Sequence, residues 1–151
     1  MENTISFNTK FGWISATETK GNISRIQFRK EKSKGSSSKN LKLLERNLIA
    51  YFQSKKELKI SIKMNGNSNQ KRIWGELKKI GVGKTKSYGE IAKKLKMSPR
   101  YIGRVCAQNK HLIAIPCHRV IRSNGALGGF SAKGGIKLKK KLLEFEKKKL
   151  L

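Results

Sequence analysis

The chain changes character at a short polar segment, NGNSNQ, at residues 65–70. Asn, Gly and Ser favour turns and loops over regular elements, so this segment has the composition of a linker. A length of 151 residues is enough for one domain or for two small ones. We therefore predict an N-terminal domain at residues 1–64, a linker at 65–70 and a C-terminal domain at 71–151.

The N-terminal half combines strand patterns with one helix pattern. Residues 4–30 carry aromatic and β-branched residues in short runs broken at Gly21 and Asn22, which is typical of a small antiparallel sheet. A Gly/Ser-rich loop follows, and residues 57–64 have the pattern of a further strand. Between them lies an amphipathic helix pattern, because apolar residues recur every three or four positions, at Leu41, Leu44, Leu48, Tyr51 and Phe52. We expect an α/β domain made of a small antiparallel sheet plus a helix.

The C-terminal half is mainly helical in pattern. Residues 71–81 predict a helix that ends at Gly81. Ser87 and Glu90 have capping-box spacing at the start of a second helix, and Ser98 with Pro99 marks the start of a third after a short KMS turn. One side of this third helix carries Ile102, Val105, Cys106 and Asn109. Two short helices joined by a tight turn predict a helix-turn-helix within a mainly α domain.

The charge indicates a polyanionic partner. Lysine and arginine number 36 against 9 acidic residues, a net charge of +27, which attracts nucleic acid or acidic lipid without choosing between them. Arg100, Arg104 and Gln108 share an outer face of the third helix, where DNA contacts would form. The same face could be an ordinary solvated surface. Because residues 91–143 contain no carboxylate, DNA is favoured, since surfaces that serve only solubility mix both signs.

Several function classes are excluded or disfavoured by composition. The chain has no aspartate, so a mechanism that needs one is excluded. No segment approaches the roughly 18 consecutive apolar residues of a membrane span, and the first ten residues lack the apolar stretch of a signal peptide. We therefore expect a cytoplasmic protein without a membrane partner. Two cysteines are too few for a disulfide framework and should be free thiols there.

The segment IPCHRV places Cys117 directly before His118 and Arg119. A thiol becomes a nucleophile as the thiolate, which a nearby base or positive charge favours. Consecutive side chains on extended backbone point to opposite sides, so the imidazole would act through a bridging water. Two other interpretations remain open from spacing alone: a cysteine that fills a core gap, and a metal site formed by Cys106, His111, Cys117 and His118.

The motifs IPCHRVI, GALGGF and KLKKKLLEFE together resemble the active-site region of the O6-alkylguanine-DNA alkyltransferases, also called methylated-DNA–protein-cysteine methyltransferases. The resemblance extends upstream through SPRYIGRVCAQN, GKTKSYGEIA and IWGELKKI, and it covers nearly all of residues 71–146. The N-terminal half resembles the family only in outline, as a small α/β domain before the catalytic one.

The resemblance implies a role for each matching residue. Cys117 would accept the alkyl group with a lowered pKa, and His118 would polarise it through a water, with Glu146 holding the imidazole. Arg100 would fill the space that the flipped base leaves in the duplex, and Tyr88 would bind the neighbouring phosphate. Further DNA contacts would come from Tyr101, Gly103, Arg104 and Arg119, and the base pocket would be formed by Val120, Phe130, Ser131 and Asn109. Phe130 stands where the family usually has tyrosine, and Tyr101 and Arg104 replace small residues.

The resemblance also implies the reaction. A base that is paired in the duplex hides its O6-alkyl group from a thiolate, so the base must be flipped out. The alkyl group of O6-alkylguanine then passes to sulfur in one displacement, each molecule acts once, and neither cofactor nor metal is needed. Double-stranded DNA would be the partner of a monomer, and O4-alkylthymine is a further candidate substrate. The alternative function is a protein that binds alkylated DNA without repairing it.

Overall fold

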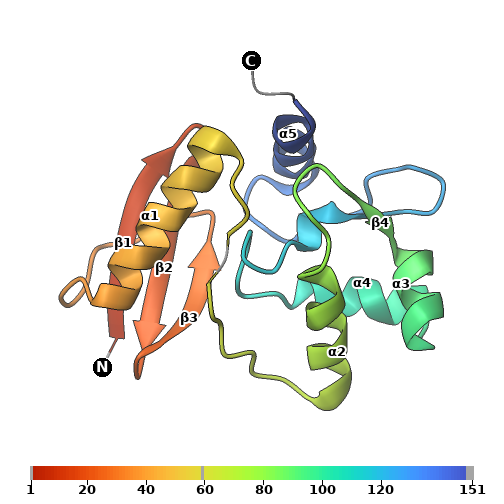
Figure 1. The fold of residues 1–151 in the computed structure, drawn as a ribbon, viewed down its shortest axis with the longest axis horizontal. Helices are drawn as coiled ribbons and strands as arrows, with labels where there is room; N and C mark the ends of the chain where they lie inside the picture. The colour runs from red at the N-terminus through yellow and green to blue at the C-terminus, as the bar shows by residue number, and fades with distance from the viewer. Residues whose placement is uncertain (1, 59, 149–151) are drawn as a thin grey trace. The chain divides into compact units, whose positions relative to one another are not determined.

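The structure, a computed structural model, describes residues 2–58 and 60–148. The chain forms two compact units (Figure 1). The first contains the N-terminal part up to Lys63 together with Lys110–Ala114, and the second contains Met64–Asn109 and the chain from Ile115 onward. Five residues from the middle of the chain thus belong to the N-terminal unit.

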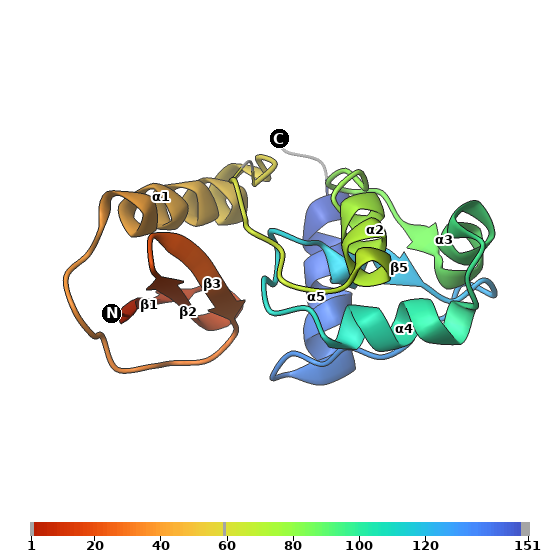
Figure 2. The same ribbon diagram turned by 90° about the horizontal axis from the view of Figure 1, so that it is seen from below.

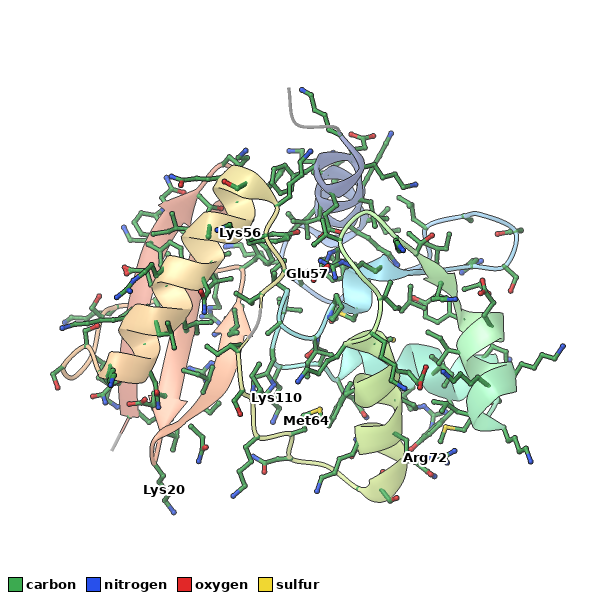
Figure 3. The ribbon with its side chains drawn as sticks, in the orientation of Figure 1. Lys20, Lys56, Glu57, Met64, Arg72 and Lys110 are labelled. Carbon is green, nitrogen blue, oxygen red and sulfur yellow. The ribbon has the colours of Figure 1, made fainter. Side chains whose placement is uncertain are left out.

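The first unit is built on a three-stranded antiparallel sheet in the order β1 (Glu2–Thr9), β2 (Gly12–Thr19), β3 (Asn22–Gln27). The turn between β2 and β3 has Lys20 at φ 52° and Gly21 at φ 80°. Two successive residues with positive φ are the signature of a type I′ turn, whose twist suits a two-residue hairpin. The exposed Lys20 side chain projects from this turn (Figure 3).

Helix α1 (Lys39–Ser54) packs on one face of the sheet, and the connection from β3 to α1 passes the opposite face (Figure 2). The helix buries the five residues that its periodicity predicts: Leu41, Leu44, Leu48, Tyr51 and Phe52. Ser38 caps its start by accepting from Leu41 N. The small antiparallel sheet and its helix are therefore confirmed.

The segment Lys110–Ala114 adds to the edge of β3. Ile26 N donates to Lys110 O at 2.8 Å, Leu112 N donates to Ile26 O at 3.1 Å, and the His111 ring bonds Ile23 O at 2.9 Å. The expected strand at residues 57–64 is wrong for the residues described there, which lie in no helix or strand. The described residues of this segment have an alternating pattern but no neighbouring strand to pair with, and a strand requires backbone pairing.

The second unit contains the remaining elements: α2 (Ser68–Leu77), β4 (Lys86–Ser87), α3 (Tyr88–Leu95), α4 (Pro99–Ala107), the 3-10 turn η1 (Cys117–Arg119), β5 (Val120–Ile121) and α5 (Gly135–Lys147). Strands β4 and β5 pair in parallel. Helix α2 begins at Ser68, because Asn67 and Gln70 form a capping box. The last three residues of the predicted linker are therefore helical.

Helices α3 and α4 pack together and are joined by a three-residue turn. Ser87 and Glu90 form the predicted capping box, and Ser98 caps α4 with Pro99 in its first turn. Lys96 takes the left-handed conformation at φ 58° and ends α3. The side of α4 predicted to face the core is buried: Ile102, Val105, Cys106 and, just after the helix, Asn109.

None of the helices in the described part of the chain is both long and apolar enough to cross a membrane.

Candidate active site

Cys117 lies at the start of η1, directly after Pro116 has ended the apolar segment. Its side chain is buried, with 4% of the residue exposed. The Asn109 amide donates to Ile115 O at 2.7 Å and to the Cys117 Sγ at 3.2 Å. The hydrogen bond to Ile115 O fixes the orientation of the Asn109 amide, and the amide can then also donate a hydrogen bond to the sulfur.

A pocket of about 650 Å³ opens onto this thiol. Its walls come from the start of α3, one side of α4, η1 and the loop between β5 and α5. Five predicted site residues line it together with Cys117: Tyr88, Arg100, Gly103, Phe130 and Ser131. The remaining lining residues are Gly89, Pro99, Cys106, Ala107, Arg122, Ser123, Gly128 and Gly129. The volume suits a small aromatic ligand such as a nucleobase with a substituent.

Behind the thiol, His118 and Glu146 form the predicted pair. His118 Nε2 lies 2.8 Å from Glu146 Oε2, and both side chains are buried. Burial would raise the pKa of Glu146, but the hydrogen bonds from His118 and Arg119 and the charge of Arg119 lower it to about 2. A carboxylate only accepts, so Nε2 carries the hydrogen and Nδ1 is the acceptor nitrogen. Burial lowers the pKa of His118, which keeps the ring neutral near pH 7.

Arg119 is a correction to the predicted DNA contacts. Only 3% of the residue is exposed. Its Nε and Nη2 each donate to Glu146 at 2.9 Å, and Nη1 donates to Ile80 O at 2.6 Å. A buried guanidinium must be paired, and Glu146 and Ile80 O are the partners of its three nitrogen atoms. Arg119 therefore holds the carboxylate and is not exposed to a phosphate.

The expectation of a lowered thiol pKa is also wrong for this structure. Burial raises the pKa of Cys117, and the Asn109 hydrogen bond and the Lys139 charge only partly oppose it. Within the part of the chain that the structure describes, no hydrogen bond joins the His118 ring directly to Sγ. Near pH 7 the Cys117 side chain is therefore a neutral thiol.

Cys106 shares the pocket with Cys117, although its side of α4 belongs to the core. Burial raises the pKa of Cys106 to about 12. This cysteine has a high pKa, as expected, but it borders the cavity. Cys106, Cys117 and His118 form no metal cluster with His111: among the described residues, no group of three or more His, Cys or Glu could hold a metal ion.

Tyr88 stands at the pocket wall against a glycine turn. A Cβ added to Gly128, which has φ +74°, would lie 3.1 Å from the tyrosine ring and 3.3 Å from its hydroxyl. The backbone at Gly128 thus approaches the ring more closely than a side chain would allow. Desolvation raises the pKa of Tyr88 to about 12, so its hydroxyl stays protonated as a hydrogen-bond donor.

The other predicted site residues lie around this pocket rather than in its walls. Tyr101 and Arg104 are on α4, half-buried and exposed respectively. Val120 is fully buried, and its carbonyl accepts from the Lys139 Nζ at 2.6 Å. Asn109 contacts the sulfur instead of the wall.

Lys139 is the residue that sequence reasoning missed. It is fully buried on α5, on the same side as Leu142 and Glu146, three and seven positions further along. The available signal was its position: Lys139 falls on the apolar stripe of a helix whose other lysines lie on the outer face.

Comparison with known proteins identifies the family of this chain. A family model described as 6-O-methylguanine DNA methyltransferase, DNA binding domain, matches residues 68–148. A methylated-DNA–protein-cysteine methyltransferase from Sulfolobus acidocaldarius is 48% identical over 97 residues, which are 64% of this chain and 61% of that protein. The chain spans 52 to 65% of the length of the first three curated relatives it matches.

Two solved structures are similar over almost the whole chain. The Mycobacterium tuberculosis O6-methylguanine methyltransferase has a TM-score of 0.84 and 27% identity, covering 97% of this chain and 93% of its own. Another structure of the M. tuberculosis protein, in complex with DNA, has a TM-score of 0.82 and 28% identity, covering 95% and 92%. The family model covers more than half of the chain and defines the class of protein to which the chain belongs. This chain belongs to the 6-O-methylguanine DNA methyltransferase family.

Proposed function

We propose that this protein repairs O6-alkylguanine in double-stranded DNA by moving the alkyl group irreversibly to Cys117. The observation that carries the proposal is the thiol at the base of a pocket large enough for a nucleobase, with Asn109 bonded to its sulfur. The paired His118 and Glu146 lie immediately behind.

The transfer is a single displacement in which a proton also moves. His118 Nδ1 takes the thiol proton through a water, as Glu146 orients the ring and stabilises the imidazolium that forms. The sulfur attacks the alkyl carbon, the carbon–O6 bond breaks, and the electron pair stays on the guanine. The proton returns to the guanine, so thiol and alkylguanine become thioether and guanine. Thioether is not hydrolysed, so one molecule acts once and no cofactor is consumed.

Helices α3 and α4 act as the helix-turn-helix, and α4 docks in the minor groove. Arg100 lines the pocket from the start of α4 and replaces the flipped base in the stack. Tyr88 donates its hydroxyl to the adjacent phosphate, and Arg104 with Tyr101 contacts the groove. Phe130 and Ser131 bound the space for guanine.

The catalytic and DNA-binding domain corresponds to the predicted residues 71–151 together with the first turn of α2 at 68–70, so the linker after the N-terminal domain at 1–64 shortens to residues 65–67. The protein acts as a monomer, because one unit carries the thiol, the pocket and the exposed face of α4.

Intact-mass spectrometry tests the proposal. The protein is incubated with a duplex carrying one O6-methylguanine and with the same duplex carrying guanine. We expect a gain of one methyl group per chain with the first duplex only. Binding of the methylated duplex without a mass change would instead favour a protein that recognises alkylated DNA without repairing it.

A further inference from the structure

Arg122 is a pocket residue to which the proposed function gives no role. It comes directly after β5 and lines the pocket together with Arg100 of α4. Both arginines are exposed, whereas Cys117 is buried, so the two cations lie at the mouth of the pocket and the thiol lies at its base. Arg100 takes the place of the flipped base, which leaves the second cation unexplained.

The charge of Arg122 is not neutralised within the protein. Among the residues that the structure describes, its side chain has neither a hydrogen bond nor an ion pair. Residues 91–143 contain no carboxylate, and Glu146 is already bonded within the buried cluster behind the thiol. An exposed and unpaired guanidinium at the mouth of a pocket is suited to bind an anionic group of a ligand.

A short hydrogen-bonded turn fixes the backbone of Arg122. Arg122 N donates to Ala126 O at 2.8 Å, and Gly125 N donates to Arg122 O at 2.9 Å. The Asn124 Oδ1 accepts from Ala126 N at 3.0 Å. Gly125 has φ +87°, a conformation that glycine adopts without strain. The turn therefore presents the Arg122 side chain from a defined position.

Two close approaches hold this loop against the start of α3. A Cβ added to Gly89 would lie 2.8 Å from the Ser123 Oγ. A Cβ added to Gly128 would lie 3.3 Å from the Tyr88 hydroxyl and 3.7 Å from the Arg122 Cγ. The Tyr88 hydroxyl and the Arg122 side chain therefore approach the same point at the pocket wall.

We propose that Arg122 and the Tyr88 hydroxyl together bind the DNA phosphate next to the flipped nucleotide. A phosphate oxygen only accepts hydrogen bonds, and both side chains are donors. Desolvation raises the pKa of Tyr88 to about 12, so the hydroxyl keeps its proton beside the arginine. The inference deepens the proposed function and rests on it for the identity of the ligand.

A phosphate held at the mouth of the pocket would favour the flipped state. Extruding a base costs free energy, and contacts made by the extruded nucleotide offset that cost. An arginine that contacted the base instead would not respond to the charge of a neighbouring phosphate. Removing that charge from the DNA therefore distinguishes the two roles.

The test combines a protein variant with a neutral DNA linkage. Binding of a duplex with one O6-methylguanine is measured in the Cys117→Ser protein, so that the substrate is not consumed. The natural duplex is compared with two duplexes that carry one uncharged methylphosphonate, on the 5′ or on the 3′ side of the lesion. We expect one of these linkages to weaken binding at least about tenfold. Adding Arg122→Met should weaken binding of the natural duplex similarly, with little further loss for that linkage.

Lys133→Met is the matched control, because Lys133 is exposed on the same loop and does not line the pocket. It should keep the full loss of affinity caused by the neutral linkage. Arg122→Lys keeps the charge and should keep part of that loss. Thermal unfolding of each variant is recorded in parallel, and the exposed position of Arg122 predicts no change.

Independent losses from Arg122→Met and from each neutral linkage would overturn the proposal, as would full affinity for both modified duplexes. Methyl transfer to the wild-type protein is measured separately. A wild type that takes no methyl group would contradict the proposed function, and a shared loss for Arg122→Met and one linkage would still establish the phosphate contact.

Discussion

The Arg119 guanidinium binds both carboxylate oxygens of Glu146, Nε to Oε1 and Nη2 to Oε2, each at 2.9 Å. The second oxygen also bonds the His118 ring at 2.8 Å. Helix α5 is thereby joined to η1 through a fully buried carboxylate. The orientation of the imidazole depends on Glu146, and the orientation of Glu146 depends on Arg119.

Replacing Arg119 by methionine should therefore damage stability rather than DNA docking. The change leaves the Glu146 charge buried and only half paired, and it leaves Ile80 O without a donor. Loss of one partner of a buried pair costs about 3–5 kcal/mol, which urea unfolding would measure.

Arg104→Met is the matched control for Arg119, because Arg104 is exposed on α4. The variant should leave the free energy of unfolding unchanged. It should make DNA binding less dependent on salt: the slope of the logarithm of the binding constant against the logarithm of the salt concentration should become shallower by about 0.9 for each phosphate that the variant no longer neutralises. A reduced slope in folded Arg119→Met would show that Arg119 does reach DNA.

The same cluster predicts how stability depends on acid. The pKa of Glu146 is about 2 in the folded protein and 4.5 in the reference state, so the unfolded chain binds its proton first. Stability from this group is present above about pH 4.5 and is lost as the pH falls towards 2, by roughly 3 kcal/mol in total. His118 also has a lowered folded pKa, so its contribution is lost as the pH falls below its unfolded value of 6.5.

Glu146→Gln tests the acid prediction. Urea unfolding of the wild type at pH values from 7 to 3 should show a steady loss of stability, and the variant should lose less between pH 4.5 and 3 because it has no carboxyl group to protonate. Equal slopes for the two proteins in that interval would show that another carboxylate carries the effect.

Arg100 and Arg104 should separate base flipping from general DNA affinity. Arg100 lines the pocket at the start of α4, whereas Arg104 lies one turn further on and outside it. Arg100→Ala should slow methyl transfer from a duplex by at least about tenfold, while transfer from free O6-methylguanine base stays near the wild-type rate. Arg104→Ala should lower the affinity for duplex DNA without the selective loss of transfer from the duplex, relative to the free base, that is expected for Arg100→Ala. Equal losses on duplex and free base would exclude Arg100 as the residue that replaces the base.

Local signals in the sequence predicted the helical elements well. Capping residues and apolar spacing act within one turn, so Ser87, Ser98 and the buried face of α1 could be identified without tertiary information. The start of α2 was missed, because the capping Asn67 lies inside a segment whose composition indicates a linker. The short pairing of β4 with β5 has no sequence pattern long enough to detect.

The site was predicted as a set of residues but not as a set of contacts. The family resemblance pointed to Cys117, His118 and Glu146, and the structure brings the last two together. The resemblance alone could not distinguish an arginine that faces DNA from Arg119, which faces Glu146. Whether an arginine faces DNA or Glu146 depends on the side of η1 to which its side chain points. Tertiary packing sets that direction, rather than the adjacent residues in the sequence.

The two cysteines give the sharpest prediction, because both line the same pocket. Burial raises the pKa of each, but only Cys117 receives the hydrogen bond from Asn109, and it directly precedes His118. Peptide mapping should therefore find one methyl group, on Cys117 alone.

Cys117→Ser should abolish transfer and keep DNA binding, since a serine hydroxyl is far less acidic. Cys106→Ser should transfer the methyl group and lose about 1–3 kcal/mol of stability if its hydroxyl lacks a partner. Methyl recovered on Cys106, or more than one turnover per chain, would contradict the mechanism.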